Sequence, residues 1–314
     1  MKDTTKIVWT PPFTIISEPL SGYLRFIFLV NIFLKKILKI RTYGPNSALE
    51  SILKWLQEFP DIHWNQNPEY EKIYEIVYVP IGVEALRYAL WLKLKGRIKK
   101  LIVWPNITSP TSASDIFFHP EIDSIVVPST WIRDWFFHML GKNDSRIFLF
   151  PAWTDDLGPR EKNDKVIIFK KECPENLFHT VCSTLSEEWI QYELFEYGKY
   201  DKDEYLEALS KAKFLIYLQT SETQWIALHE AWMKGVPTLV WNRGYCEYRW
   251  NTWIDSHISA PYLTDECGMF FSSENDFPVA FQLFLGKLNS YTPRKYSLDN
   301  FTHKKTITRL LARV

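Results

Sequence analysis

Residues 221–237, SETQWIALHEAWMKGVP, lie between two apolar runs, FLIYL at 214–218 and TLVW at 238–241. This order predicts a strand, a loop, a helix and a second strand. Gly235 can adopt the left-handed backbone that ends a helix, and Pro237 prevents the helix from continuing. Loops that follow parallel strands gather at the carboxyl edge of the sheet. Glu222 and Glu230 are therefore expected near that edge.

The spacing of these two glutamates, followed by Ala231 and a Gly-x-Pro turn into a strand, resembles a known donor-site signature. It is the signature of retaining GT-B glycosyltransferases of the "glycosyl transferases group 1" type. The resemblance implies that Glu222 lies beside the donor sugar and that Glu230 holds the ribose of the nucleotide. A carboxylate accepts two hydroxyl hydrogen bonds at once, and vicinal sugar hydroxyls offer such a pair. The loop before the helix would direct backbone N–H groups toward a diphosphate.

The turn after the first glutamate departs from the family pattern, which has a small glycine two or three residues later. Thr223, Gln224 and Trp225 fill this turn instead. Trp225 would either stack on a base or sugar or narrow the site. Ser221, just before the glutamate, would cap the helix or touch phosphate. These four residues complete the donor-binding set that the resemblance implies.

Basic residues are also expected at the donor edge. Lys170 and Lys171 follow the apolar run 166–169, where the resemblance implies a basic pair that stabilises the leaving diphosphate. Negative charge grows on the leaving diphosphate during transfer. Fixed cations beside the diphosphate should therefore stabilise the transition state most. The family's second lysine would fall on Asn176 and is not matched. Two solvated lysines are the other interpretation. Arg243, after the strand at 238–241, is a further donor-side candidate, with local pairing as its alternative.

Two histidines are candidate general bases. His119 lies in a Phe-His-Pro loop of the first half and is the acceptor-side candidate. A base at this point would suit an inverting enzyme. His229, beside Glu230, is a second candidate. An ordinary surface loop histidine is the alternative for His119.

The sequence favours no metal site and no cofactor other than the nucleotide sugar as substrate. The Asp-x-Asp motif of metal-dependent GT-A transferases is matched by Asp201-Lys202-Asp203, but these residues begin a predicted helix. Aspartate is favoured there simply as an N-cap. The paired Asp155 and Asp156 fall in a predicted linker, and the seven histidines show no metal-ligand spacing.

Strand and helix patterns alternate along the 314 residues, which predicts an α/β fold with mostly parallel, doubly wound sheets. The resemblance implies a GT-B architecture, with two Rossmann-like domains facing across a cleft. Residues 1–150 would form the acceptor-side domain, 151–164 the linker and 165–314 the donor domain. A basic helix at about 300–314 would cross back to the first domain.

Composition narrows the function classes. The 37 basic and 37 acidic residues cancel, which excludes the basic surface typical of nucleic-acid binding. Four cysteines without CxxC spacing indicate reduced thiols and a cytoplasmic location. The apolar segment 23–40 ends in Lys35, Lys36, Lys39 and Arg41. It predicts either a buried helix or a peripheral contact with anionic membrane.

Together these features predict a retaining, metal-independent glycosyltransferase of polysaccharide biosynthesis. It would move a sugar from a nucleoside diphosphate donor to a glycan, lipid-linked or other hydroxyl acceptor. Two alternatives stay open. One is a catalytically silent GT-B domain that binds sugars or partners, and the other is an inverting nucleotide-sugar enzyme.

Overall fold

A computed structural model describes residues 13–16, 62–65, 68–80, 82–103, 114–161, 165–223, 226–248 and 251–312. Two compact units make up the chain. The first contains the described residues within 1–127, 139–148 and 308–314, and the second contains 128–138 and 149–307. The sequence also predicts a strand at 6–10 and a helix at 47–59. These segments, the segment 23–40 and the basic residues at 35–41 lie outside the described residues. The division into acceptor and donor domains at 150 stays a prediction.

The first sheet has six strands in the order β2-β1-β3-β4-β5-β6. The strands are β1 (Phe13–Ile15), β2 (Ile62–Trp64), β3 (Tyr74–Val79), β4 (Ile98–Val103), β5 (Ser124–Val127) and β6 (Ile147–Leu149). The pairings of β1 with β2 and β3, of β3 with β4 and of β4 with β5 are parallel. Among the described residues, the helices between these strands are α3 (Val83–Leu94), α4 (Ser114–Phe117) and α5 (Thr130–Leu140).

The second sheet is parallel throughout and has the order β13-β10-β9-β7-β8. Its strands are β7 (Lys165–Lys170), β8 (Tyr192–Glu196), β9 (Ala212–Leu218), β10 (Thr238–Trp241) and β13 (Gly268–Phe271), with β11 (Tyr245–Tyr248) and β12 (Asn251–Ile254) forming a separate antiparallel hairpin. The helices are α6 (Glu175–Glu187), α7 (Lys202–Ser210), α8 (Ile226–Lys234), α9 (Phe277–Gly286), α10 (Pro293–Asn300) and α11 (His303–Leu311), with a 3₁₀ turn at Leu288–Ser290.

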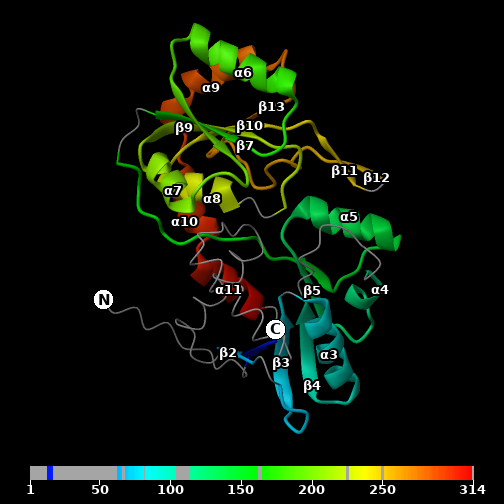
Figure 1. The fold of residues 1–314 in the computed structure, drawn as a ribbon. Helices are drawn as coiled ribbons and strands as arrows, with labels where there is room; N and C mark the ends of the chain where they lie inside the picture. Colours follow the sequence, from blue (N-terminus) through cyan, green and yellow to red (C-terminus); the bar gives the residue numbers. More distant parts are fainter. Residues whose placement is uncertain are drawn as a thin grey trace. The chain divides into compact units, whose positions relative to one another are not determined.

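Helices cover both faces of the second sheet because alternate side chains of each strand point to opposite faces. On one face Ile167, Phe169 and Tyr217 pack with residues of α7 and α8. On the other, Ile168 and Ile216 pack with residues of α6 and α9. Figure 1 shows α6 and α9 on one side of β7, β9 and β10, with α7, α8 and α10 on the other.

The described residues of 214–241 fold as the predicted strand, loop, helix and second strand. The helix spans Ile226–Lys234 within that segment, and the second strand spans Thr238–Trp241, the apolar run predicted to form it. Gly235 has φ 81° at the end of α8, and its N–H donates to the carbonyl of Trp232. Residues 227–233 are all buried, so α8 is a core helix of the second unit. The α/β class with parallel sheets is confirmed.

Several elements differ from the sequence-based expectation. The hairpin β11–β12, the short strand β13 and helix α10 were not expected. The basic helix expected at 300–314 spans only His303–Leu311, because a separate helix, α10, precedes it. It begins in the second unit and ends in the first. Among the described helices none is long and apolar enough to cross a membrane.

Gly268 begins β13 directly opposite Thr238. Its φ is 154°, and a Cβ at this position would lie 1.8 Å from the carbonyl oxygen of Thr238. We expect Gly268→Ala to lower the free energy of unfolding by about 3 kcal/mol, the upper range for overpacking. Gly286→Ala is the matched control, since a Cβ there meets nothing within 4 Å. Urea denaturation of both variants measures the difference, and equal stability would contradict this account of β13.

Candidate functional site

The loop that carries Glu222 follows β9, and two hydrogen bonds hold the backbone of this residue, one to a backbone carbonyl and one from a tryptophan side chain. The N–H of Glu222 donates to the carbonyl of Ile258 at 2.9 Å. Its own carbonyl accepts a hydrogen bond from the indole Nε1 of Trp131 at 3.1 Å. The backbone of this glutamate is thus fixed independently of its side chain.

Three donors surround the buried carboxylate of Glu222, which is 8% exposed. Its Oε2 accepts from the Tyr217 hydroxyl at 2.8 Å and from the Lys171 ammonium at 3.2 Å. Its Oε1 accepts from the Thr223 backbone N–H at 3.1 Å. A carboxylate offers about four lone-pair directions. The described residues therefore leave about one of them, on Oε1, for a ligand.

The electrostatics of this cluster keep Glu222 ionised. Burial opposes ionisation, but the Lys171 charge and the hydrogen bonds from Tyr217, Lys171 and Thr223 hold the pKa of the carboxyl below its ordinary value. Burial alone would lower the pKa of Lys171, yet the adjacent carboxylate raises it above the ordinary value. The pair is therefore a carboxylate and an ammonium at neutral pH.

Glu230 has a different environment. It lies on α8, is 4% exposed, and its Oε1 is 3.2 Å from the ammonium of Lys202 at the start of α7. Burial raises the pKa of Glu230, Lys202 offsets part of this effect, and the charge of Asp155 adds to it. The two glutamates are thus pushed in opposite directions, one toward ionisation and one toward protonation.

Of the two predicted lysines, the structure brings only one to Glu222. Lys170 pairs with Glu175 at 2.7 Å and lies 4.2 Å from the ring centroid of Phe178. Consecutive residues at a strand end point to opposite faces of the sheet, which separates Lys170 from Lys171. Asn176, where the family's second lysine would fall, donates its amide to Glu274.

The remaining donor-side candidates make local contacts. Arg243 donates to the carbonyl of Tyr245 at 2.8 Å, lies over the Tyr245 ring and is 3.7 Å from Glu247. This matches the local pairing that was its alternative. Thr220 donates its hydroxyl to Glu172, and the carbonyl of Ser221 accepts from Gln219. Gln224 and Trp225 lie outside the described residues.

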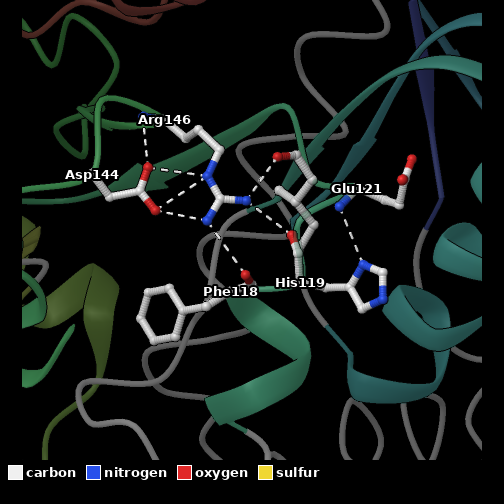
Figure 2. A network of polar contacts seen from close by, with 6 residues as sticks. Phe118, His119, Glu121, Asp144 and Arg146 are labelled. Carbon is white, nitrogen blue, oxygen red and sulfur yellow. Dashed lines mark hydrogen bonds and ion pairs between the residues drawn. The ribbon is translucent and has the colours of Figure 1, made fainter.

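His119 belongs to a polar network of the first unit (Figure 2). Arg146 is paired with Asp144 at 2.6 Å and donates to the carbonyls of Phe118, His119 and Ile122. The Nδ1 of His119 accepts from the backbone N–H of Glu121 at 3.2 Å. A neutral ring that accepts at Nδ1 carries its proton on Nε2. In that tautomer Nε2 donates a hydrogen bond and cannot take up the acceptor proton, which disfavours the general-base role of an inverting enzyme.

His229 is part of the core. It is fully buried, and its ring centroid lies 4.5 Å from that of Phe301. Burial lowers the pKa of His229 to about 3, so the ring is neutral at physiological pH. A buried neutral imidazole against two aromatic rings is a packing residue rather than a base that reaches an acceptor.

The Asp-x-Asp sequence is a helix start. Asp201 is the N-cap of α7 and accepts from the backbone N–H groups of Asp203 and Glu204. Asp156 pairs with Arg294 at 2.7 Å. Within the described parts of the chain, no group of three or more His, Cys, Asp or Glu side chains could hold a metal ion.

No protein-family model matches the chain, and no curated protein matches it in sequence. Several solved structures match the chain in fold. The apo form of the lipopolysaccharide outer core galactosyltransferase WaaB has a TM-score of 0.55 at 14% identity, over 96% of this chain and 99% of that one. A sucrose-phosphate synthase from Thermosynechococcus elongatus has a TM-score of 0.53 at 10% identity, over 96% and 97%. The chain has the GT-B fold. The two Rossmann-like parallel sheets expected from the sequence are therefore confirmed.

Within this GT-B fold, three residues near the glutamates were not predicted from the sequence. They are Tyr217 and Lys202, which contact the two carboxylates, and Trp131, which holds the Glu222 carbonyl. Tyr217 lies inside an apolar run, so the sequence predicts only a buried core residue there. Lys202 was considered only as the middle of the Asp-x-Asp sequence. Neither contact has a local sequence signal, because each joins separate elements.

Proposed function

We propose that this GT-B chain is a retaining glycosyltransferase that uses a nucleoside diphosphate sugar. The observation that carries the proposal is the ion pair between half-buried Lys171 and buried Glu222 beside the carboxyl end of a parallel sheet, with Glu230 on the helix that follows. Ligands of open α/β sheets bind at this edge. The fold is shared with proteins named as a galactosyltransferase and a sucrose-phosphate synthase, which supports the same class of chemistry.

In the proposed reaction the bond between the anomeric carbon and the diphosphate oxygen breaks, and the acceptor oxygen takes its place. Negative charge passes to the leaving diphosphate, and the acceptor proton leaves with it. Lys171 would stabilise that charge, and Glu222 would hold a hydroxyl of the donor sugar. Glu230 would bind the ribose hydroxyls. Ser221, Thr223, Gln224 and Trp225 complete the proposed donor site, and Lys170 and Arg243 have supporting roles at most.

The proposed acceptor is a glycan or a lipid-linked hydroxyl, bound by the first unit, and no divalent metal is required. A cytoplasmic location is proposed from the cysteine pattern. Contact with anionic membrane is proposed on the sequence of residues 35–41 alone. Liposome binding at low salt that is lost on Lys35→Glu with Lys36→Glu would support it.

A thermal-shift screen against UDP, GDP, TDP and CDP sugars tests the proposal. A ligand that binds only the folded protein raises its melting temperature by mass action. We expect one nucleotide class to stabilise the protein, and the same donor to be hydrolysed or transferred in a turnover assay with EDTA present. If no donor stabilises the protein and none is turned over, the proposal is wrong.

One observation favours a second candidate, a GT-B domain that binds sugars without turnover. All three cations predicted at the donor edge are already paired with acids: Lys171 with Glu222, Lys170 with Glu175 and Arg243 with Glu247. The position for a further lysine is Asn176. Stabilisation by a nucleotide sugar without any release of nucleoside diphosphate would identify this second function.

The raised pKa of Glu230 predicts how nucleotide-sugar binding depends on pH. The ionised carboxylate accepts two ribose hydroxyls, whereas the protonated form accepts fewer. Affinity should therefore be full above the raised pKa and fall as the pH drops through it. Isothermal titration from pH 7.5 to pH 5 measures this. Glu230→Gln should be weaker throughout and lose this dependence; an unchanged pH dependence in Glu230→Gln would contradict the assignment.

A further inference from the structure

Tyr217 and Lys171 reach Glu222 from the same face of the sheet, and the strand register explains why. Tyr217 on β9 is paired directly with Phe169 on β7. Their rings stack at a centroid distance of 5.3 Å and an interplanar angle of 14°. Lys171 follows Phe169 by two residues and therefore shares its face. The phenol and the ammonium thus converge on one carboxylate.

The Tyr217 hydroxyl has a fixed direction and a fixed role. The side chain is 1% exposed, and its hydroxyl lies 2.8 Å from Oε2 of Glu222. Burial, with the nearby Glu222 charge, raises the pKa of this phenol well above its ordinary value. The hydroxyl consequently stays protonated and donates to the carboxylate. A donor on a rigid, stacked ring restricts the carboxylate to one orientation.

We propose that Tyr217 is a positioning residue that orients Glu222 for the sugar by binding Oε2 together with Lys171. Both donors occupy Oε2, while Oε1 takes only the Thr223 N–H among the described residues. Glu222 therefore presents one acceptor direction, on Oε1, to a single donor-sugar hydroxyl. This inference rests on the proposed function, because the oriented carboxylate matters only where a sugar binds.

Tyr217→Phe tests the inference, since it removes the hydroxyl and keeps the stacked ring. We expect kcat to fall about 10- to 100-fold, the range for one hydrogen bond to a charged group, with the Kd of the nucleoside diphosphate unchanged within about twofold. The charged form of Glu222 loses a donor, so its pKa should rise and the acidic limb of the kcat profile should move to higher pH. The titratable groups facing Glu222 are Lys171 and Tyr217, and Lys171 is also near Tyr197 and Glu172.

Tyr205→Phe is the matched control. Tyr205 is equally buried in the same aromatic cluster, but its hydroxyl donates to the Ala227 carbonyl at 3.0 Å. Carbon-13 NMR of the glutamate carboxyls follows the titration of Glu222 without any substrate. The pKa of Glu222 measured in this way should be higher in Tyr217→Phe than in wild type, and it should be unchanged in Tyr205→Phe.

Two results would overturn the inference. One is a Glu222 titration that is the same in wild type and Tyr217→Phe. The other is a shifted titration with an unchanged kcat. If the wild-type protein has no turnover at all, the proposed function fails instead. The NMR titration then still decides whether Tyr217 controls the carboxylate.

Discussion

Lys171→Met is expected to lower turnover about 100-fold, the usual effect of removing one charge-stabilising group from a transition state. The same change at Lys170 should leave turnover within about threefold, because its ammonium pairs with Glu175 and not with Glu222. The two variants remove the same charge from neighbouring residues, and only Lys171 contacts Glu222. Steady-state kinetics with the identified donor measures the difference. Equal loss in both variants would contradict the assignment of Lys171.

Lys171→Met should also destabilise the protein, because it leaves the Glu222 carboxylate buried without its ammonium. Breaking a fully buried pair costs about 3–5 kcal/mol. The loss should be smaller here, because Lys171 is partly exposed and the remaining acid can take up a proton. Adding Glu222→Gln should restore most of the stability but none of the turnover. A double-mutant cycle by urea denaturation separates this structural effect from the catalytic one. Additive losses of stability would mean that the two side chains do not interact.

Glu230→Gln is expected to weaken binding of the bare nucleoside diphosphate about 10- to 100-fold, since the ribose hydroxyls lose a charged acceptor. The matched control is Glu204→Gln. Glu204 is an exposed glutamate in the first turn of α7, the helix that supplies Lys202. Its replacement should leave the dissociation constant within about twofold.

Isothermal titration gives both constants. A Glu230→Gln variant that binds the nucleotide like wild type would remove Glu230 from the donor site. Glu222→Gln should show the complementary pattern, with turnover lost and the affinity for bare nucleotide kept. The two glutamates are thereby assigned separate tasks.

Local signals in the sequence were enough to predict the core elements of the second unit. Gly235 and Pro237 end α8 as predicted, and the apolar runs at 214–218 and 238–241 lie in β9 and β10. These features depend only on residues close together in the sequence, so they can be recognised before the tertiary structure is known. The strand β13 was not predicted because it begins with Gly268, a residue that weakens the sequence pattern of a strand.

The face of each strand could not be read from the sequence. Both faces of the second sheet are buried, so β7 and β9 are nearly continuous apolar runs without alternation. The sequence therefore does not indicate whether Lys170 or Lys171 lies on the α8 side. The register of β7 with β9 decides this, and it also brings Tyr217 to Glu222. Lys202 reaches Glu230 only because α7 packs beside α8.

A crystal structure of the protein with the nucleoside diphosphate selected by the thermal-shift screen tests the central claim most directly. The account predicts both ribose hydroxyls within hydrogen-bond distance of Glu230, at about 2.5–3.2 Å. It also predicts the distal phosphate beside the Lys171 ammonium. A nucleotide bound at a place where it contacts neither Glu230 nor Lys171 would contradict it.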